Sequence, residues 1–238
     1  MKKAIVIGAS SGIGRELAKL LAADDYTIAI MARRTNLLNA LQSELPNGAL
    51  VKQLDVENTN DSVSILTELI EEMAGVDLIV FAAGNGELNE NLEWELEHAS
   101  IATNVVGFAA VANIALKHFI KRKSGHFVAI SSVAALRGGK ASPAYNASKA
   151  YISNYLEGLR QKVTCLGLPI IITDIKPGFV DTAMAKGEGQ FWVASAQKAA
   201  RQIYDAINKR KSHVYVTKRW RLIAWLLRTM PNYLYNRL

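Results

Sequence analysis

Short apolar runs alternate along the chain with longer segments in which apolar residues recur every three or four positions. The short runs are apolar nearly throughout, which is typical of strands buried on both faces of a sheet. The longer segments have the spacing of amphipathic helices. The runs predict strands over 4–7, 27–31, 49–54, 78–82, 126–130, 170–175 and 214–216. The helical spacing predicts helices over 12–23, 37–45, 62–73, 99–120, 145–163 and 194–207.

This alternation predicts a single-domain α/β fold, a doubly wound parallel sheet of the Rossmann type flanked by helices. Right-handed crossovers bring every strand-to-helix loop to one edge of such a sheet, where ligands bind. The candidate motifs of this chain lie in those loops or just after them. We expect a catalytic domain over residues 1–217 and an amphipathic, helical C-terminal tail over 218–238.

The charge of the chain is distributed unevenly. There are 28 basic and 21 acidic residues, a net charge of +7, and ten of the basic residues but only one acidic residue lie between Lys198 and Leu238. Nucleic-acid-binding proteins more often carry basic residues across their main binding face, so we expect no nucleic-acid partner. A basic tail fits a contact with anionic lipid, an acidic partner or an anionic substrate, and equally a solvated surface.

Cysteine and histidine usage excludes two kinds of site. Cys165 is the one cysteine, so an internal disulfide is excluded and a reducing cytoplasm is expected. The four histidines show no metal-ligand spacing, and we expect no metal. No stretch approaches the ~20 apolar residues that span a bilayer. We therefore expect a cytoplasmic protein whose tail allows a peripheral contact with a membrane.

A glycine-rich loop separates the first predicted strand from the first predicted helix. Glycines there let a pyrophosphate approach backbone N–H groups at the N-terminus of a helix. The spacing is G-x-x-x-G-x-G and differs from the G-x-G-x-x-G dinucleotide fingerprint. Its position between strand and helix nevertheless favours a nucleotide site. The predicted contacts are Gly8, Ser10, Ser11, Gly12, Ile13 and Gly14.

The second predicted strand ends in Arg33 and Arg34, with no carboxylate beside them. Enzymes that use NAD usually place an acidic residue here to bind the ribose hydroxyl. A guanidinium group instead suits the 2′-phosphate of NADP(H). We therefore expect NADP(H) as the preferred cofactor and NAD(H) as the alternative. Surface arginines at the start of a helix remain the other interpretation.

Tyr145 and Lys149 lie four residues apart in a predicted helix and so share one face. Ser132 lies thirteen residues before Tyr145, just after a predicted strand. Asn104 lies in the preceding long helix. Each of these features is common by itself, but their order and their positions in the fold are specific together.

In this order the motifs resemble those of the short-chain dehydrogenase/reductase family, over roughly residues 3–182. The resemblance implies the catalytic set Asn104, Ser132, Tyr145 and Lys149, with all but Ser132 also contacting the cofactor. It implies further cofactor contacts at Asp55, Val56, Ala82, Ala83, Gly84, Pro177, Gly178, Val180 and Thr182. Two positions depart from the family pattern: Ile7 replaces a threonine and Ala82 replaces an asparagine. Both departures concern the bracing of the sheet edge more than the chemistry.

The resemblance implies an oxidoreductase that transfers a hydride between nicotinamide and a carbonyl or alcohol carbon. Tyr145 would be the acid/base, Lys149 would lower its pKa and hold the ribose, and Ser132 would stabilise the substrate oxygen. Asn104 would position a water that links Lys149 to solvent. A homodimer or homotetramer built on the two long helices is implied in the same way. The alternatives are a redox-sensing or regulatory protein, and a lyase or epimerase on the same scaffold.

The tail contains Trp220 and Trp225 among arginines and is too short to span a bilayer. Three interpretations stay open: the tail packs on the domain or on a partner subunit, docks on an anionic membrane, or caps the substrate pocket. Segment 183–193 would cover the substrate in the family, and its Phe191 and Trp192 favour a hydrophobic substrate.

Overall fold

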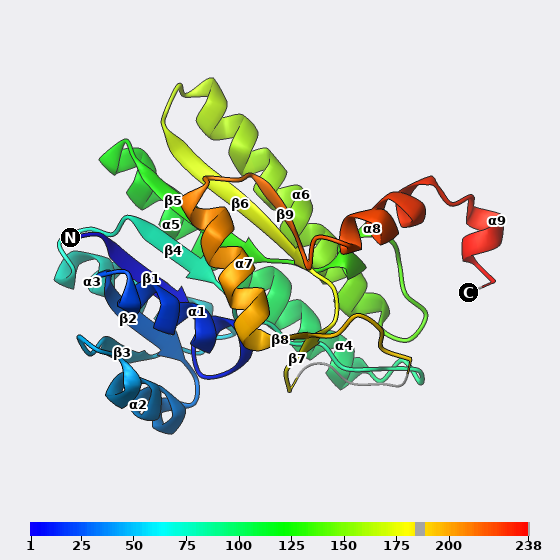
Figure 1. The fold of residues 1–238 in the computed structure, drawn as a ribbon, viewed down its shortest axis with the longest axis horizontal. Helices are drawn as coiled ribbons and strands as arrows, with labels where there is room; N and C mark the ends of the chain where they lie inside the picture. The colour runs from blue at the N-terminus through cyan, green and yellow to red at the C-terminus, as the bar shows by residue number, and fades with distance from the viewer. Residues whose placement is uncertain (184–188, 238) are drawn as a thin grey trace.

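The computed structural model describes residues 1–183 and 189–237, and its centre is a seven-stranded parallel sheet (Figure 1). The strand order is β3-β2-β1-β4-β5-β6-β9. The strands are β1 (Lys3–Ile7), β2 (Thr27–Ala32), β3 (Leu50–Gln53), β4 (Leu78–Phe81), β5 (Gly125–Ile130), β6 (Ile170–Pro177) and β9 (His213–Val216). The chain builds outward from β1 to β3 and then returns to place β4 beside β1. The doubly wound sheet is thereby confirmed, and its topological switch point lies between β1 and β4.

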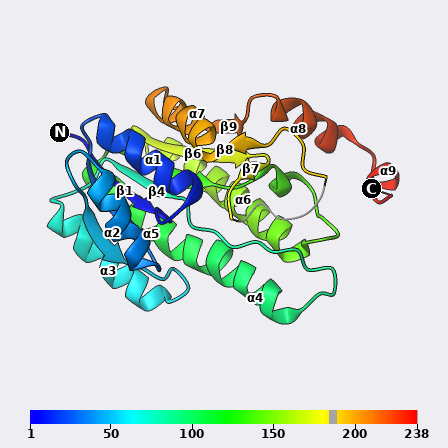
Figure 2. The ribbon, with the colours of Figure 1, turned by 60° about the horizontal axis from the view of Figure 1, so that its bottom comes forward.

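Helices cover both faces of the sheet (Figure 2). One buried cluster joins α1 (Gly12–Ala23), α2 (Thr35–Glu44) and α7 (Ala196–Asn208) to the sheet. The other joins α3 (Thr59–Glu72), α5 (Phe108–Arg122) and α6 (Pro143–Cys165) to the opposite face. In β1, Val6 belongs to the first cluster and Ile5 and Ile7 to the second. Both faces of each strand are buried, which explains why the strands are apolar runs rather than alternating ones.

The long predicted helix 99–120 begins earlier and is interrupted. It consists of α4 (Trp94–Ile101), a π-helical segment (Ala102–Gly107) and α5. Taken as one helical stretch, Trp94–Arg122 is long and apolar enough to cross a membrane by length and composition. The expectation that no stretch reaches this criterion is therefore wrong. Half of its most apolar window is buried in the fold, as in a helix that covers a sheet.

The tail forms two helices, α8 (Trp220–Thr229) and α9 (Asn232–Tyr235). They extend beyond the sheet at the end of the molecule opposite the N-terminus (Figures 1 and 2). The start of α8 packs on the domain, since Trp220 is 3% exposed. Three short elements were not expected from the sequence: a 3-10 turn (Val133–Leu136), β7 (Val180–Asp181) and β8 (Ala194–Ser195). The last two pair with each other beside the main sheet.

Candidate active site

A cavity of about 1620 Å³ runs along the carboxyl ends of the strands and under the tail. Its wall includes nearly all of the residues expected to form the site. These are Gly8, Ser10, Ser11, Gly12, Ile13, Gly14, Arg33, Arg34, Val56, Ala82, Ala83, Gly84, Ser132, Tyr145, Lys149, Pro177, Gly178, Val180 and Thr182. Asp55 and Asn104 are absent from this lining and lie behind it. Residues far apart in the sequence are thus brought together by the sheet topology.

Two glycines allow the loop after β1 to meet the loop after β4. Gly8 has a φ of +90°, and a Cβ added there would lie 2.4 Å from the backbone nitrogen of Ala83. A Cβ on Gly14 would lie 2.3 Å from the carbonyl oxygen of Gly8. No larger residue fits either position without moving backbone. The close packing leaves open space in front of the N-terminus of α1, where an anionic group is favoured.

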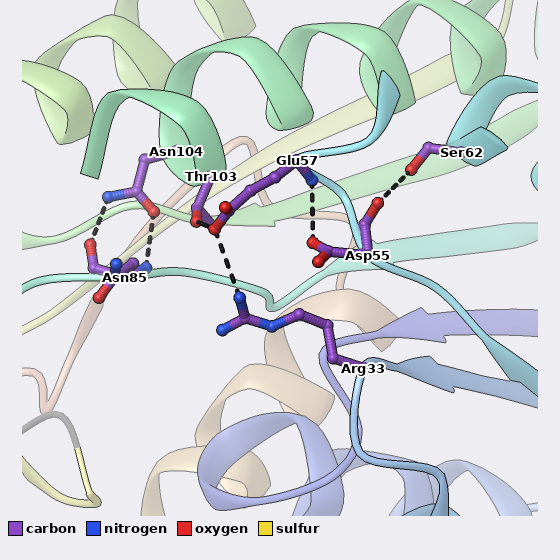
Figure 3. A network of polar contacts seen from close by, with 7 residues as sticks. All are labelled: Arg33, Asp55, Glu57, Ser62, Asn85, Thr103 and Asn104. Atoms are coloured by element: carbon purple, nitrogen blue, oxygen red, sulfur yellow. Dashed lines mark hydrogen bonds and ion pairs between the residues drawn. The ribbon is translucent and has the colours of Figure 1, made fainter. Parts of the chain in front are cut away.

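The two arginines after β2 have different partners. Arg34 donates from Nη2 to the hydroxyls of Ser10 at 2.9 Å and Ser11 at 2.8 Å. Arg33 pairs instead with Glu57, with 3.5 Å between Nη1 and Oε1, and Thr103 donates to the same carboxylate oxygen at 2.5 Å (Figure 3). Glu57 was not expected at the site, because it follows Asp55 and Val56 without any motif of its own.

Asp55 and Asn104 both act on the backbone behind the cavity wall (Figure 3). The Asp55 carboxylate accepts from the backbone N–H of Glu57 at 3.1 Å and so shapes the turn after β3. Asn104, fully buried in the π-helical segment, exchanges two hydrogen bonds with the backbone of Asn85, at 2.6 and 2.9 Å. Its amide also donates to the Ser148 hydroxyl at 2.9 Å. Asn104 therefore ties the loop after β4 to helix α6.

Ser132, Tyr145 and Lys149 meet in the cavity. Tyr145 and Lys149 lie one turn apart near the start of α6, and the Lys149 Nζ lies 5.7 Å from the centre of the tyrosine ring. The ammonium donates to the backbone oxygen of Ile130 at 3.2 Å. Ser132 follows β5, and its hydroxyl is hydrogen-bonded to Tyr145. The strand end and the helix start thus present a hydroxyl, a phenol and an ammonium to one space.

Burial is the main cause of the pKa shifts of Tyr145 and Lys149. It lowers the pKa of Lys149 to about 8, against the opposing charge of Asp174. Burial also raises the pKa of Tyr145, and the hydrogen bond from Ser132 only partly offsets this. The expected lowering of the Tyr145 pKa is therefore not met in this structure, because desolvation of a phenolate outweighs the stabilising contacts. At neutral pH Tyr145 keeps its proton.

A buried polar network supports the strand that precedes Ser132, and the sequence analysis missed it. Asp174 is fully buried in β6 and forms an ion pair with Lys176. Ser131 donates to the other carboxylate oxygen of Asp174 at 2.5 Å. The network fixes the backbone beside Ser132. A carboxylate in the middle of a mostly apolar strand, with Lys176 two residues later, was the signal that could have found it.

Aromatic rings form the opposite end of the cavity. Trp220 stacks on Phe191 with 5.1 Å between ring centres and meets Phe179 edge-on at 5.5 Å. The same indole lies directly against Gly178, where any Cβ would overlap the ring. The tail continues the wall with Leu227, Asn232, Tyr235 and Asn236. Residues 184–188 of the segment expected to cover the substrate lie outside the described residues.

Arg137 holds the tail in this position. Its guanidinium donates to the backbone oxygens of Leu227 at 3.1 Å and Met230 at 3.0 Å, at the carboxyl end of α8. It also donates to Asn232 Oδ1 at 2.9 Å and lies 4.2 Å from the ring centre of Tyr235. Of the three interpretations of the tail, packing on the domain and lining the cavity both describe this structure.

Comparison with known proteins gives the family from the sequence and supports the fold. Residues 2–191 match the short chain dehydrogenase family. An uncharacterized oxidoreductase from Myxococcus xanthus is 37% identical over 188 residues, which cover 77% of this chain and 74% of the relative.

Two solved structures share the fold. A short chain dehydrogenase/reductase from Burkholderia phymatum in complex with NAD has a TM-score of 0.83 at 21% identity and covers 94% of this chain and 92% of its own. A short-chain dehydrogenase from Sphingobium yanoikuyae in complex with NADPH has a TM-score of 0.82 at 19% identity and covers 98% and 97%. With the sequence match over most of its length, the chain belongs to the short-chain dehydrogenase/reductase family of oxidoreductases.

Proposed function

We propose that this protein is an NADP(H)-dependent oxidoreductase that interconverts a carbonyl and an alcohol on an apolar substrate. One observation carries the proposal: a single cavity is lined by the glycine loop, by the group Ser132, Tyr145 and Lys149, and by an aromatic wall. The three parts correspond to a site for a nucleotide, a site for proton transfer and a site for an apolar molecule.

The residues present fit a nicotinamide dinucleotide. The close packing at Gly8 and Gly14 keeps the glycine loop against the loop after β4, and a pyrophosphate would lie at the N-terminus of α1, which favours an anion. Lys149 and Thr182 line the same cavity, and Thr182 lies against Gly12 of the glycine loop, so both are available to the bound cofactor. When bound, the cofactor supplies or accepts the hydride.

The chain itself handles the proton. Tyr145 is protonated at neutral pH, since burial raises further a pKa that is ordinarily about 10, and its hydroxyl can donate a proton to the oxygen of a carbonyl substrate. Ser132, hydrogen-bonded to the same phenol, donates to that oxygen and stabilises its developing charge. The Lys149 ammonium, below its pKa of about 8, stabilises the phenolate that remains. Asn104 and Ser148 connect α6 to the loop after β4 and hold this geometry.

The polar groups at the glycine-loop end of the cavity favour NADP(H) over NAD(H). Arg34, held by Ser10 and Ser11, combines a guanidinium with two hydroxyls, a donor set that suits a phosphate. Glu57 pairs with Arg33 and leaves Arg34 as the main phosphate ligand. The relatives of known structure include complexes with either cofactor, so the preference rests on these side chains.

The first test compares the affinities for NADPH and NADH by tryptophan fluorescence. Trp220 lies against Gly178 on the cavity wall, so its emission reports binding. We expect NADPH to bind at least about tenfold more tightly, ~1.4 kcal/mol. Equal affinities for NADPH and NADH would contradict the proposed preference for NADP(H). If neither cofactor binds, the alternative of a regulatory protein is favoured.

The second test supplies NADPH labelled with deuterium and a panel of apolar aldehydes and ketones. We expect deuterium on the carbinol carbon of the product and loss of turnover in Tyr145→Phe with NADPH binding retained. A product without deuterium would point to a lyase or epimerase instead.

Two further expectations stay predictions. A homodimer or homotetramer is expected from the family, and light scattering on the purified protein measures it directly. A cytoplasmic location, with or without contact to a membrane, is measured by fractionation of cells that produce the protein.

A further inference from the structure

Helix α8 is apolar on two opposite faces. Its inward face, with Trp220 and Ala224, is 2–3% exposed and forms part of the cavity wall. Leu222, Trp225 and Leu226 follow the i, i+3, i+4 spacing and share the other face. These three side chains are 67%, 67% and 45% exposed. An outward face this apolar is unusual for a surface helix unless it meets a partner.

Helix α9, which directly follows α8 in the chain, carries two more exposed apolar side chains. Tyr233 is 67% exposed and Leu234 is 45% exposed. We call Leu222, Trp225, Leu226, Tyr233 and Leu234 the tail patch. A helix of ten residues is about 15 Å long, half the thickness of a bilayer core, so α8 can lie in a membrane surface but not cross it.

The surroundings of the tail patch are basic. Arg221 and Arg228 are exposed and lie seven residues apart, on the same side of α8 and next to the apolar face. Arg228 also lines a second cavity, in which Arg160 and Glu157 both take part. From Lys198 onward the one acidic residue is Asp205.

The tail patch is presented rigidly. The bonds from Arg137 fix the carboxyl end of α8, and the hydroxyl of Tyr235 donates to the backbone oxygen of Gly138. Because the inward face already packs on the domain, the helix cannot turn its outward side chains inward without losing these contacts. The outward face therefore stays available for an external surface.

We propose that the tail patch binds the surface of an anionic lipid bilayer. Exposed tryptophan and leucine beside arginine are what such an interface accommodates, with rings among the headgroups and guanidinium groups on phosphates. A second copy of this chain fits less well, because a symmetric contact would bring the two basic tails together. Given the proposed function, attachment here places the aromatic wall of the cavity next to the phase in which an apolar substrate dissolves.

The experiment is sedimentation of the full-length protein with vesicles. We expect binding to vesicles of phosphatidylcholine mixed with phosphatidylglycerol, much weaker binding to phosphatidylcholine alone, and a loss of binding in high salt. Leu222→Gln with Trp225→Gln lowers the partition coefficient at least tenfold. Arg221→Gln with Arg228→Gln lowers it on anionic vesicles only.

Matched controls lie elsewhere on the surface. Leu92 and Trp94, 63% and 64% exposed just before and at the start of α4, are changed to glutamine as the apolar control. Lys117 and Lys121 on α5 are changed to glutamine as the charge control. Both controls keep full vesicle binding. Trp225→Phe keeps binding but loses the blue shift of tryptophan emission that vesicles cause in the wild type.

Three results overturn the proposal. The wild type ignores anionic vesicles, or the Leu92 and Trp94 control loses binding as fully as the tail variant. In the third, the tail variant changes a dimer into a monomer while the wild type shows no vesicle binding, which assigns the patch to a second copy. Affinity for NADPH, measured without lipid, separates these outcomes from a failure of the proposed function, because no tail-patch residue lines the cavity.

Discussion

At the scale of single residues, the two arginines after β2 are predicted to contribute differently to cofactor binding. Arg34 is held toward the glycine loop by Ser10 and Ser11, whereas the charge of Arg33 is paired with Glu57. Arg34→Ala should weaken NADPH about 10- to 100-fold, the worth of a charge-assisted hydrogen bond to phosphate, and change NADH little. Arg33→Ala is the matched control and should weaken NADPH binding several-fold at most. Titration of both cofactors into both variants measures this, and an equal loss for NADPH and NADH in Arg34→Ala would contradict the assignment.

Gly86 sets the position of the Tyr145 ring, the proposed proton donor. A Cβ added to Gly86 would lie 2.3 Å from the ring of Tyr145, so Gly86→Ala must displace that ring or the loop after β4. We expect kcat to fall about 10- to 100-fold, as for a displacement of ~1 Å at a reacting group, with NADPH affinity nearly unchanged. Gly138→Ala is the control: it also lines the cavity, but its Cβ would meet open space. An unchanged kcat in Gly86→Ala would show that the phenol tolerates the displacement.

At the scale of elements, Arg137 connects the 3-10 turn after β5 to the tail. Arg137→Ala removes the bonds to the carboxyl end of α8 and should loosen α8 and α9 without unfolding the sheet. We expect KM for a large apolar substrate to rise several-fold, turnover of a small carbonyl to persist, and proteolysis near Met230 to become faster. Arg137→Lys should recover little, because one ammonium cannot reach the same three acceptors. A variant with wild-type KM and wild-type proteolysis would leave Arg137 without this role.

The helices and strands also show which parts of the fold could be predicted from the sequence and which could not. Apolar runs predicted the seven strands, and the order of motifs predicted that Ser132, Tyr145 and Lys149 would share a space, because parallel strands end at one edge. Neither kind of pattern could reveal Arg137 on the tail, since that contact spans about ninety residues and has no local signal. The π-helical segment around Asn104 was missed because a single wide turn leaves the apolar spacing of a helix nearly unchanged.

The raised pKa of Tyr145 was missed for a related reason. Its position four residues from Lys149 predicted a favourable charge nearby, and the structure does bring the ammonium to 5.7 Å from the ring. The burial that outweighs this contact comes from the loops after β4 and β5, which meet only in the folded chain. Spacing along a helix therefore predicted that Tyr145 and Lys149 lie close together, but not the effect of burial on their pKa values.

At the scale of the whole molecule, the buried ammonium of Lys149 reduces the stability of the fold. Burial lowers the pKa of Lys149 to about 8 from an ordinary 10.5, and a shift of that size corresponds to roughly 3 kcal/mol of unfolding free energy. Between pH 8 and pH 10.5 the unfolded chain binds a proton that the folded chain does not. The contribution of this group to stability therefore rises with pH across that range, and the full cost is present below pH 8.

Lys149→Met should accordingly abolish turnover and raise the melting temperature at pH 7, since methionine fills a similar volume without charge. The free energy of unfolding should increase by at most about 3 kcal/mol at pH 7, reduced by the loss of the hydrogen bond to Ile130. This increase should become smaller as the pH rises toward 10.5. Denaturant unfolding of both proteins across this pH range measures it, with Lys117→Met on the surface of α5 as a control that shows no such pH dependence. If Lys149→Met is less stable than the wild type at every pH, the ammonium stabilises the folded protein, and the proposed proton-transfer site does not reduce its stability.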